Sequence, residues 1–542
     1  MFVPAASNTR LRTTARAPSI REPDSGICRS VNSSGAAAAE AGRAVVARTS
    51  DACTADAPSA QPWAPRLSQE ERLRELDALL AQPPNAATDD LAVERAALLA
   101  ALDRRDAAQE AFVAILRRAP THFAGLNEFG ALLTRMGAVD AACRVYAEAI
   151  AHHPNNPIAH VNLGNLAWRA GRHQEARTRF EAALKIDPDQ AAAHQGLGAV
   201  LSDLGDMAAA QAHLARGFRD RAVVTLPYRG ARPPLPVLQL ISSGGGNIPT
   251  APFLDDHEFL VTVVVADHVD PSVALPPHRL IFNAIGDADR CGPALAAAKA
   301  LIARTAAPVV NPPAAVERTS RLETARRLGA LTGVVAPRMT LAARGDLEGP
   351  MAAATLGRVG LTFPLLLRSP GYHTGQNFVH VATAGDLPAA VAALPGDELL
   401  AIEFLDARGA DGQFRKYRVM CIDGALYPVH LAIARDWKVH YFTSDMAERA
   451  EHRAEEAAFL ADMQGTLGDR ATAALERIRD VLGLDYGGVD FGISRAGDLL
   501  LFEANATMIL VPPPADARFA YRREAAARAL EAAAGMTRSR AR

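Results

Sequence analysis

A repeated unit of 34 residues constrains this chain more than any other feature. Three consecutive copies occupy residues 121–154, 155–188 and 189–222, and they share glycines, alanines and bulky side chains at fixed offsets. In register these are Phe129-Gly130, Leu163-Gly164 and Leu197-Gly198; Gly137, Gly171 and Gly205; Ala142, Ala176 and Ala210; and Tyr146, Phe180 and Leu214. Small residues let two helices approach, and glycine accepts the strained backbone of the turn between them. The period therefore predicts stacked helix pairs.

The repeats resemble the tetratricopeptide repeat, which implies an all-α solenoid over residues 66–225. A less regular unit, residues 89–120, is either a further repeat or a cap. Two roles stay open for the solenoid. It is either a spacer or dimerisation arm, or a concave groove that holds a peptide or protein segment.

Length and composition indicate a multidomain globular protein. A chain of 542 residues is too long for one core, and a formal charge of −2 gives no basic field for nucleic acid. No apolar run reaches the length of a membrane span, and the five cysteines lack CxxC spacing, so we expect a cytoplasmic protein without membrane partners. Residues 1–65 are expected to form a disordered low-complexity tail, and the Pro/Gly-rich residues 226–235 a linker.

Beyond the linker, apolar runs alternate with a helical segment. The runs are PVLQLISS, FLVTVVVAD and RLIFNAIGD, and the helical segment is PALAAAKALIART. This pattern is typical of a parallel sheet covered on both faces and predicts an α/β domain over residues 236–316. The glycines of SSGGGN follow the first run, where backbone amides can meet an anion, although a flexible turn is the alternative.

A candidate metal site lies near the C-terminus. Asp490, Glu503 and Asn505 lie on two strand-like runs joined by a turn at residues 495–497. Alternate residues of a strand share a face, so Glu503 and Asn505 point the same way, and the hairpin can bring Asp490 opposite them. Two carboxylates and an amide oxygen are ligands that suit a Mg²⁺ ion bridging nucleotide phosphates. Both acids lie in apolar runs, where an unpaired carboxylate would be costly, so the sequence predicts a magnesium site.

The spacing of these three residues resembles the metal-binding hairpin of the ATP-grasp superfamily, and the order of the preceding segments is similar as well. The resemblance implies that residues 236–316 are a precursor domain, that residues 317–535 are an α+β ATP-grasp domain, and that residues 536–542 are a tail. It also implies ATP and Mg²⁺ as cofactors. In most members lysines stand where Arg321 and Arg368 fall here. Arginine keeps the charge, so phosphate binding is still expected.

The resemblance implies further nucleotide-binding residues in a phosphate loop and in a strand beside the adenine. These are Gly371, His373, Gly375, Glu403, Phe404, Leu405 and Asp406. The glycines would allow close approach to phosphate. Backbone groups of Phe404 and Leu405 would bond the adenine edge, and Glu403 or Asp406 would contact the ribose.

Lysine is rare in this chain. Of 58 basic residues only four are lysine, and two of them, Lys416 and Lys438, fall in one segment, although so few events leave chance open. Lys416 is expected to act in catalysis together with Arg418, whose planar fork suits a phosphate or a substrate carboxylate. His430 and His440 are secondary candidates, because histidines in apolar strands more often pack or form hydrogen bonds.

The function implied is that of an ATP- and Mg²⁺-dependent ligase that forms a carbon–nitrogen bond. A carboxylate would attack the γ-phosphate to give an acyl phosphate, and an amine would then displace phosphate. The repeats would recruit a peptide or protein partner. Two alternatives remain open. One is a small-metabolite ligase whose repeats serve only assembly, and the other is a non-catalytic ATP-binding scaffold. The sequence does not identify the acid, the amine or the oligomer.

Overall fold

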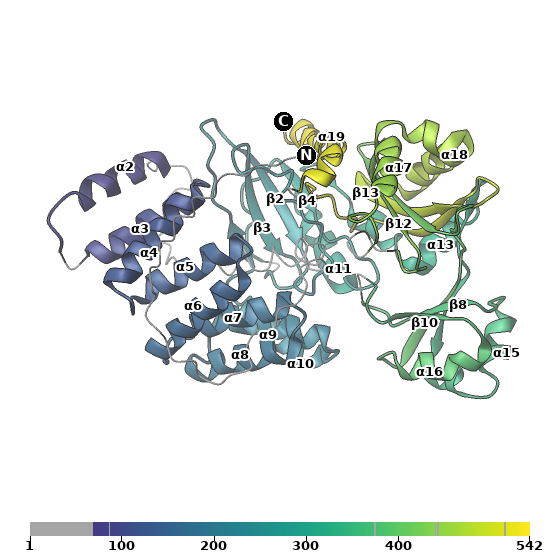
Figure 1. Cartoon of the computed structure of the whole chain (residues 1–542), viewed down its shortest axis with the longest axis horizontal. Coiled ribbons are helices and arrows are strands. Elements are labelled where there is room, and N and C mark those ends of the chain that lie inside the picture. The colour runs from purple at the N-terminus through teal and green to yellow at the C-terminus, as the bar shows by residue number, and fades with distance from the viewer. Residues whose placement is uncertain are drawn as a thin grey trace, which may run out of the picture. The chain divides into compact units, whose positions relative to one another are not determined.

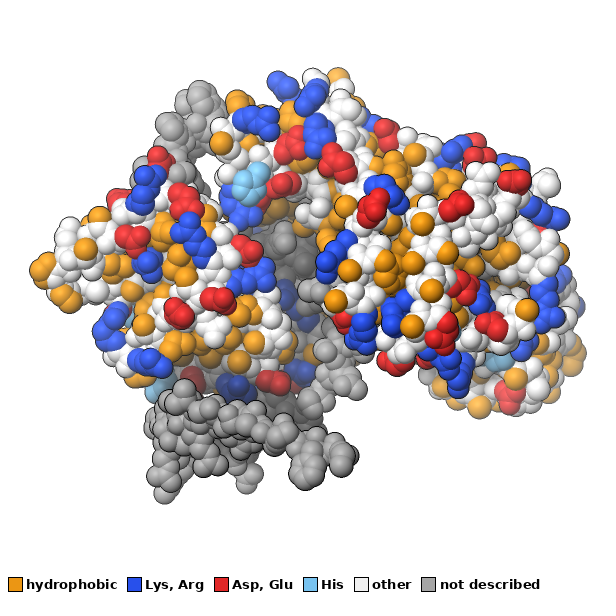
Figure 2. Space-filling view, turned by 45° about the horizontal axis from the view of Figure 1, so that its top comes forward, with side chains coloured by type: hydrophobic (Ala, Val, Ile, Leu, Met, Phe, Trp, Pro, Cys, Tyr) orange, Lys and Arg blue, Asp and Glu red, His pale blue; other side chains and the backbone are white. Residues whose placement is uncertain are grey.

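The computed structural model describes residues 69–85, 87–270, 272–372, 375–439, 441, 444–513 and 516–542. The expected tail of residues 1–65, His373 and His440 lie outside the described residues. A helical region comes first and three sheets follow it along the chain (Figure 1). None of the described helices is both long and apolar enough to cross a membrane. On the face shown in Figure 2, acidic and basic side chains are interspersed.

Each predicted repeat is one pair of helices joined by a short turn. The helices are α2 (Gln69–Leu80), α3 (Thr88–Ala101), α4 (Arg105–Arg118), α5 (Phe123–Arg135), α6 (Val139–His152), α7 (Ile158–Arg169), α8 (His173–Ile186), α9 (Ala191–Asp203) and α10 (Met207–Gly217). The turn glycines Gly137, Gly171 and Gly205 have φ values of 76°, 73° and 88°, which L side chains rarely adopt. The prediction of stacked helix pairs is confirmed.

Glycines inside the helices are required by the aromatic rings that face them. The fully buried ring of Phe180 in α8 lies between Gly164 of α7 and Gly196 of α9. A Cβ atom at Gly164 would lie 2.8 Å from Phe180 Cε1, and one at Gly196 would lie 2.3 Å from Phe180 Cζ. Both distances are shorter than a van der Waals contact. The aromatic ring at position 180 therefore requires glycine at positions 164 and 196.

The first sheet begins where the repeats end. Leu214 and Phe218, at the end of the last pair, belong to the hydrophobic core of the α/β region. Residues 223–225, expected within the solenoid, form β1 (Val223–Thr225), which pairs antiparallel with β3 (Phe259–Val265). The sheet order is β1-β3-β2-β4-β5, and β3, β2, β4 and β5 run parallel, as predicted. The remaining elements here are β2 (Leu235–Ile241), β4 (Leu280–Asn283), α11 (Gly292–Ile302), β5 (Val309–Val310) and α12 (Pro313–Glu317).

Two further sheets follow. A four-stranded antiparallel sheet has the order β7-β10-β8-β9. A five-stranded sheet has the order β12-β11-β13-β14-β6, and only its β14–β6 pair is parallel. The strands are β6 (Val334–Val335), β7 (Met339–Ala343), β8 (Leu365–Arg368), β9 (Phe378–Val381), β10 (Glu398–Glu403), β11 (Phe414–Ile422), β12 (Ala425–Ala434), β13 (Tyr486–Ile493) and β14 (Leu499–Asn505). The helices are α13 (Arg321–Leu328), α14 (Arg344–Glu348), α15 (Ala352–Arg358), α16 (Leu387–Ala392), α17 (Ala450–Ala461), α18 (Met463–Leu482) and α19 (Arg523–Ala541).

Residues 536–542 are expected to form a tail. Instead, residues 536–541 are the last part of helix α19. Met536 is buried, because this face of α19 packs against strands of two sheets. Arg538 forms a bidentate ion pair with Glu258 beside β3, at 2.6 and 2.9 Å. Arg540 lies 2.8 Å from an oxygen of Asp423 and 2.8 Å from an oxygen of Asp485, both at ends of strands in the five-stranded sheet. Helix α19 therefore joins the first sheet to the five-stranded sheet.

Candidate functional site

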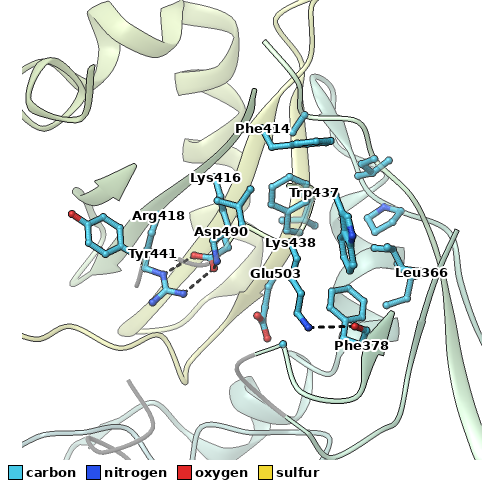
Figure 3. A pocket seen from close by; sticks show the side chains of 18 of the residues that line it. Leu366, Phe378, Phe414, Lys416, Arg418, Trp437, Lys438, Tyr441, Asp490 and Glu503 are labelled. Carbon is cyan, nitrogen blue, oxygen red and sulfur yellow. Dashed lines mark hydrogen bonds and ion pairs between the residues drawn. The ribbon is translucent and has the colours of Figure 1, made fainter. Parts of the chain in front are cut away.

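A cavity of about 350 Å³ is lined by residues of both the four-stranded and the five-stranded sheet (Figure 3). The four-stranded sheet contributes Met339, Leu366, Arg368, Phe378, Ile402 and Glu403. The five-stranded sheet contributes Phe414, Lys416, Arg418, Val429, His430, Asp490, Leu501, Glu503 and Asn505. Segments after strands close its sides, including residues 437–439 and 507–509.

One row of polar side chains crosses four strands of the five-stranded sheet. Arg418 on β11 is opposite His430 on β12 and also opposite Asp490 on β13. Asp490 is in turn opposite Glu503 on β14. The predicted hairpin is thus confirmed, and its two carboxylates are cross-strand neighbours.

Asp490 is ionised and held by two cations. Arg418 donates from Nε to Oδ1 at 2.6 Å and from a terminal nitrogen to Oδ2 at 2.8 Å, and Lys416 Nζ lies 3.3 Å from Oδ2. Burial alone would raise the pKa of Asp490, but Arg418 and Lys416 outweigh it and hold this pKa far below its usual range. Arg418 and Lys416, expected to face phosphate, are therefore also the counter-ions of Asp490.

Glu503 and Asn505 form the second half of the predicted metal site. Glu503 Oε1 accepts hydrogen bonds from Arg321 at 2.5 Å and from Asn505 Nδ2 at 2.9 Å. Asn505 Oδ1 accepts from the backbone N–H and the hydroxyl of Thr507, at 3.0 and 2.9 Å. Two carboxylates and an amide oxygen on adjacent strands fit the oxygen chemistry of Mg²⁺. An ion there would compete with Arg321 and Arg418 for the carboxylate oxygens.

Arg368 is a buried cation without an acidic partner among the described residues. Its side chain is 7% exposed, donates to the carbonyl of Tyr372 and lies over the Phe378 ring, 5.6 Å from the centroid. Burial, and then the nearby charge of Arg321, lower the pKa of Arg368 to about 10. Arg368 therefore remains charged at neutral pH, and the wall that it shares with Arg321 is suited to an anion.

An apolar compartment occupies the other part of the cavity, and in Figure 3 Leu366, Phe378 and Trp437 lie together there, away from Tyr441. The rings of Phe378 and Trp437 meet edge to face with centroids 5.2 Å apart. Lys438 Nζ lies 3.4 Å from the Phe378 carbonyl, so one cation borders this compartment. Flat aromatic and aliphatic walls of this kind suit a planar apolar group.

Most residues expected in the site line this single cavity: Arg321, Arg368, Gly375, Glu403, Phe404, Leu405, Lys416, Arg418, Asp490, Glu503 and Asn505. Gly371 and Asp406 do not line it. Asp406 instead forms an ion pair with Arg408 at 2.5 Å. Glu403, expected near a ribose, is held by Arg338 at 2.7 and 3.1 Å, so a ribose contact would compete with that pair.

Sequence reasoning missed several lining residues, above all Trp437, Tyr441 and Arg522. Arg522 adjoins an arginine- and alanine-rich run whose composition is that of an exposed helix. Its buried partner, Glu456, lies far away in the sequence and carries no motif. Only the three-dimensional contact reveals this pair.

Comparison with known proteins identifies the repeats. Tetratricopeptide repeat families match residues 130–191 and 167–222. Similar solved structures include a MamA fragment from Desulfovibrio magneticus RS-1, at 20% identity over 34% of this chain and 95% of that chain, with a TM-score of 0.24. A thermophilic TPR protein of Thermus thermophilus is 21% identical over 24% of this chain and 73% of that chain, with a TM-score of 0.23. No curated protein matches. Residues 130–222 are therefore tetratricopeptide repeats, which suggests a role in protein–protein interaction.

Proposed function

We propose that this protein is an ATP- and Mg²⁺-dependent ligase of the ATP-grasp type, which joins a carboxylate to an amine, and that its repeats bind a peptide or protein partner. The observation that carries the proposal is Arg368, a buried cation without an acidic partner among the described residues, beside an apolar compartment in the same cavity. A nucleotide combines the two complementary chemistries, because it has a planar base at one end and phosphates at the other.

The volume of the cavity and the arrangement of its lining residues support this proposal. A volume of about 350 Å³ lies within the usual range of small-molecule sites. Phe404 and Leu405 line the same cavity, and their backbone groups would meet the edge of the base. The phosphates would then extend toward Arg321, Arg368 and Glu503.

The residues of this chain would contribute mainly charge and position. A bound Mg²⁺ ion would be held by Glu503, Asn505 and Asp490, and it would neutralise phosphate charge. Arg368 and Arg321 would stabilise the charge that spreads over the oxygens of the transferring phosphoryl group. The ion pairs with Asp490 would hold Arg418 and Lys416 in position beside that group.

The proposed reaction has two steps. A carboxylate oxygen of the acid bonds to the γ-phosphorus, and ADP leaves with the electron pair of the broken phosphorus–oxygen bond. The amine nitrogen then bonds to the acyl carbon, phosphate leaves, and the nitrogen releases a proton. Water must be excluded from the acyl phosphate, and the cavity between two sheets is suited to that.

Binding of ATP to three variants tests the proposal. Arg368→Ala should weaken binding by about tenfold or more in the presence of Mg²⁺, and Arg368→Lys should retain part of the affinity. Arg358→Ala, which removes an exposed arginine of α15, is the matched control and should bind as the wild type does. Titration calorimetry measures the affinities, and melting temperatures check the fold. Equal affinity in all variants, or no binding by the wild type, would mean that the proposed nucleotide site is wrong.

A further inference from the structure

Apart from Arg418, which borders the proposed γ-phosphate position, part of the cavity wall has no role in the proposed nucleotide site. Arg418, His430, Tyr441 and Arg522 are neighbours there, and the apolar side chains Met508, Ile509 and Val511 line the same cavity. In Figure 3 Tyr441 lies beside Arg418, on the opposite side of Asp490 from Trp437 and Leu366. We call this set of residues the acyl compartment.

Arg522 is the buried cation of the acyl compartment. Its Nε lies 3.2 Å from Oε1 of Glu456, and its guanidinium carbon lies 4.1 Å from the centroid of the Tyr441 ring. Glu456 is fully buried and also accepts hydrogen bonds from the hydroxyls of Tyr441 and Tyr521. Burial raises the pKa of Glu456, although Arg522 and the two tyrosine hydroxyls oppose this rise. The network holds the guanidinium in the cavity wall, and among the described residues its Nε has no hydrogen-bond partner.

His430 supplies a polar atom that has no partner among the described residues. The side chain is buried beside Arg418, and its Nδ1 forms no hydrogen bond there. Burial, and then the charge of Arg418, lower the pKa of His430 well below its usual range, so the ring is neutral. A neutral imidazole can bond an oxygen without adding charge. A buried polar atom in a cavity wall is costly unless a ligand satisfies it.

The rest of the acyl compartment is apolar. Met508, Ile509 and Val511 follow strand β14, and Val439, from the segment after β12, lines the same cavity. The acids that line the cavity are Glu403, Asp490 and Glu503, and each is paired with an arginine. An ammonium group on a ligand would therefore meet no unpaired carboxylate among these described residues, and a second carboxylate that lay among the apolar side chains would be costly to bury.

We propose that the acyl compartment binds the acid substrate, and that this substrate is a monocarboxylic acid with an apolar side chain. Arg522 and Arg418 hold its carboxylate, and one carboxylate oxygen accepts a hydrogen bond from the His430 ring. Its side chain packs on Met508, Ile509 and Val511. This placement rests on the proposed function, since it sets the carboxylate beside the γ-phosphate of ATP. The carboxylate oxygen attacks the phosphorus, ADP leaves, and the acyl phosphate remains in the compartment until an amine displaces phosphate.

The full-length protein is tested with ATP, Mg²⁺ and hydroxylamine as the amine. The acids are straight and branched monocarboxylic acids of increasing length, with dicarboxylic acids for comparison. Hydroxamate formation reports the acyl phosphate. Apolar monocarboxylic acids should give the highest kcat/KM, about tenfold or more above dicarboxylic acids of equal length. Equal use of both classes would overturn the proposed specificity.

Two kinds of variant test whether the acid binds in the acyl compartment. Arg522→Lys keeps the charge and loses the fork, so KM for the acid should rise about tenfold while KM for ATP stays within about twofold. Ile509→Ala should lower kcat/KM for the preferred acid by about tenfold, and Ile509→Phe should shift the preference toward shorter acids. Ile509 is half-buried, so these variants remain informative if Arg522→Lys fails to fold. Val359→Ala, at an exposed position outside the cavity, should leave the preference unchanged.

The outcomes separate the two proposals. If the wild type uses ATP but the Ile509 variants keep the wild-type preference, the acyl compartment is wrong and the proposed function stands. If the wild type binds no ATP, the proposed function is wrong. Calorimetric titration of the monocarboxylic acid series alone then still tests the compartment, because binding that is lost in Arg522→Lys would support it and absent binding of every acid would overturn it.

Discussion

The ring of Phe180, held between two glycines, makes a strong prediction about the repeats. In Gly196→Ala the new Cβ would lie 2.3 Å from Phe180 Cζ, so the ring must move. It cannot move toward Gly164, because it already packs closely there. Overpacking of this kind costs about 3 kcal/mol, and alanine gains about 1 kcal/mol over glycine in a helix. The net destabilisation of this region should be about 2 kcal/mol, or about thirtyfold in local opening.

Hydrogen exchange in the intact protein measures this local change, since a multidomain chain does not unfold in one transition. Amides of α7, α8 and α9 should exchange about thirtyfold faster in Gly196→Ala. In a Phe180→Leu background the same substitution should cost much less, because the ring is gone. Unchanged exchange in Gly196→Ala, or an equal cost in both backgrounds, would refute the packing argument.

Three further predictions concern the cavity and the core. Glu503→Gln should lower ATP turnover by about a hundredfold or more with little change in melting temperature. Asp490→Asn should also lose about 3–5 kcal/mol of stability, because Arg418 would keep its place without a counter-ion. Turnover assays and thermal melts check both variants. Since the pKa of Asp490 is lower in the folded than in the unfolded protein, its contribution to stability should be present above the pKa of the unfolded chain, about 4, and lost as the pH falls further. Urea unfolding from pH 5 to 3 should therefore show a smaller loss of stability in Asp490→Asn than in the wild type, and equal losses would contradict this. Burial raises the pKa of Cys421 to about 12, so its thiol should resist a disulfide reagent at pH 8 until the protein is denatured, and rapid labelling of the native protein would contradict this burial.

Local pattern explains why the repeats and the hairpin could be predicted. The repeat contacts join neighbouring elements and recur at fixed offsets, so glycines and aromatic residues reveal the helix pairs directly. The hairpin of Asp490 and Glu503 follows from alternation along two strands with a short turn between them. In both cases the residues that interact are close in sequence.

Long-range contacts explain what the sequence did not predict. Arg338 holds Glu403, and Arg522 holds Glu456, although neither pair has a recognisable spacing. Such pairs depend on how the sheets and helices pack, and the same acids could equally be solvated on an isolated strand or helix. The solenoid predicted from the sequence includes residues 223–225 for the same reason, because the strand that pairs with β1 is β3, which lies beyond the linker.

The position of helix α19 along the chain has a consequence for biosynthesis. Helix α19 is synthesised after every strand that it contacts, and domains tend to fold in the order in which they leave the ribosome. The repeats can stack early because their contacts are between neighbours. Until α19 docks, Glu258, Asp423 and Asp485 lack the arginines that pair with them, and apolar strands stay uncovered. A nascent chain would thus present finished repeats to a partner while its sheets still needed protection from aggregation.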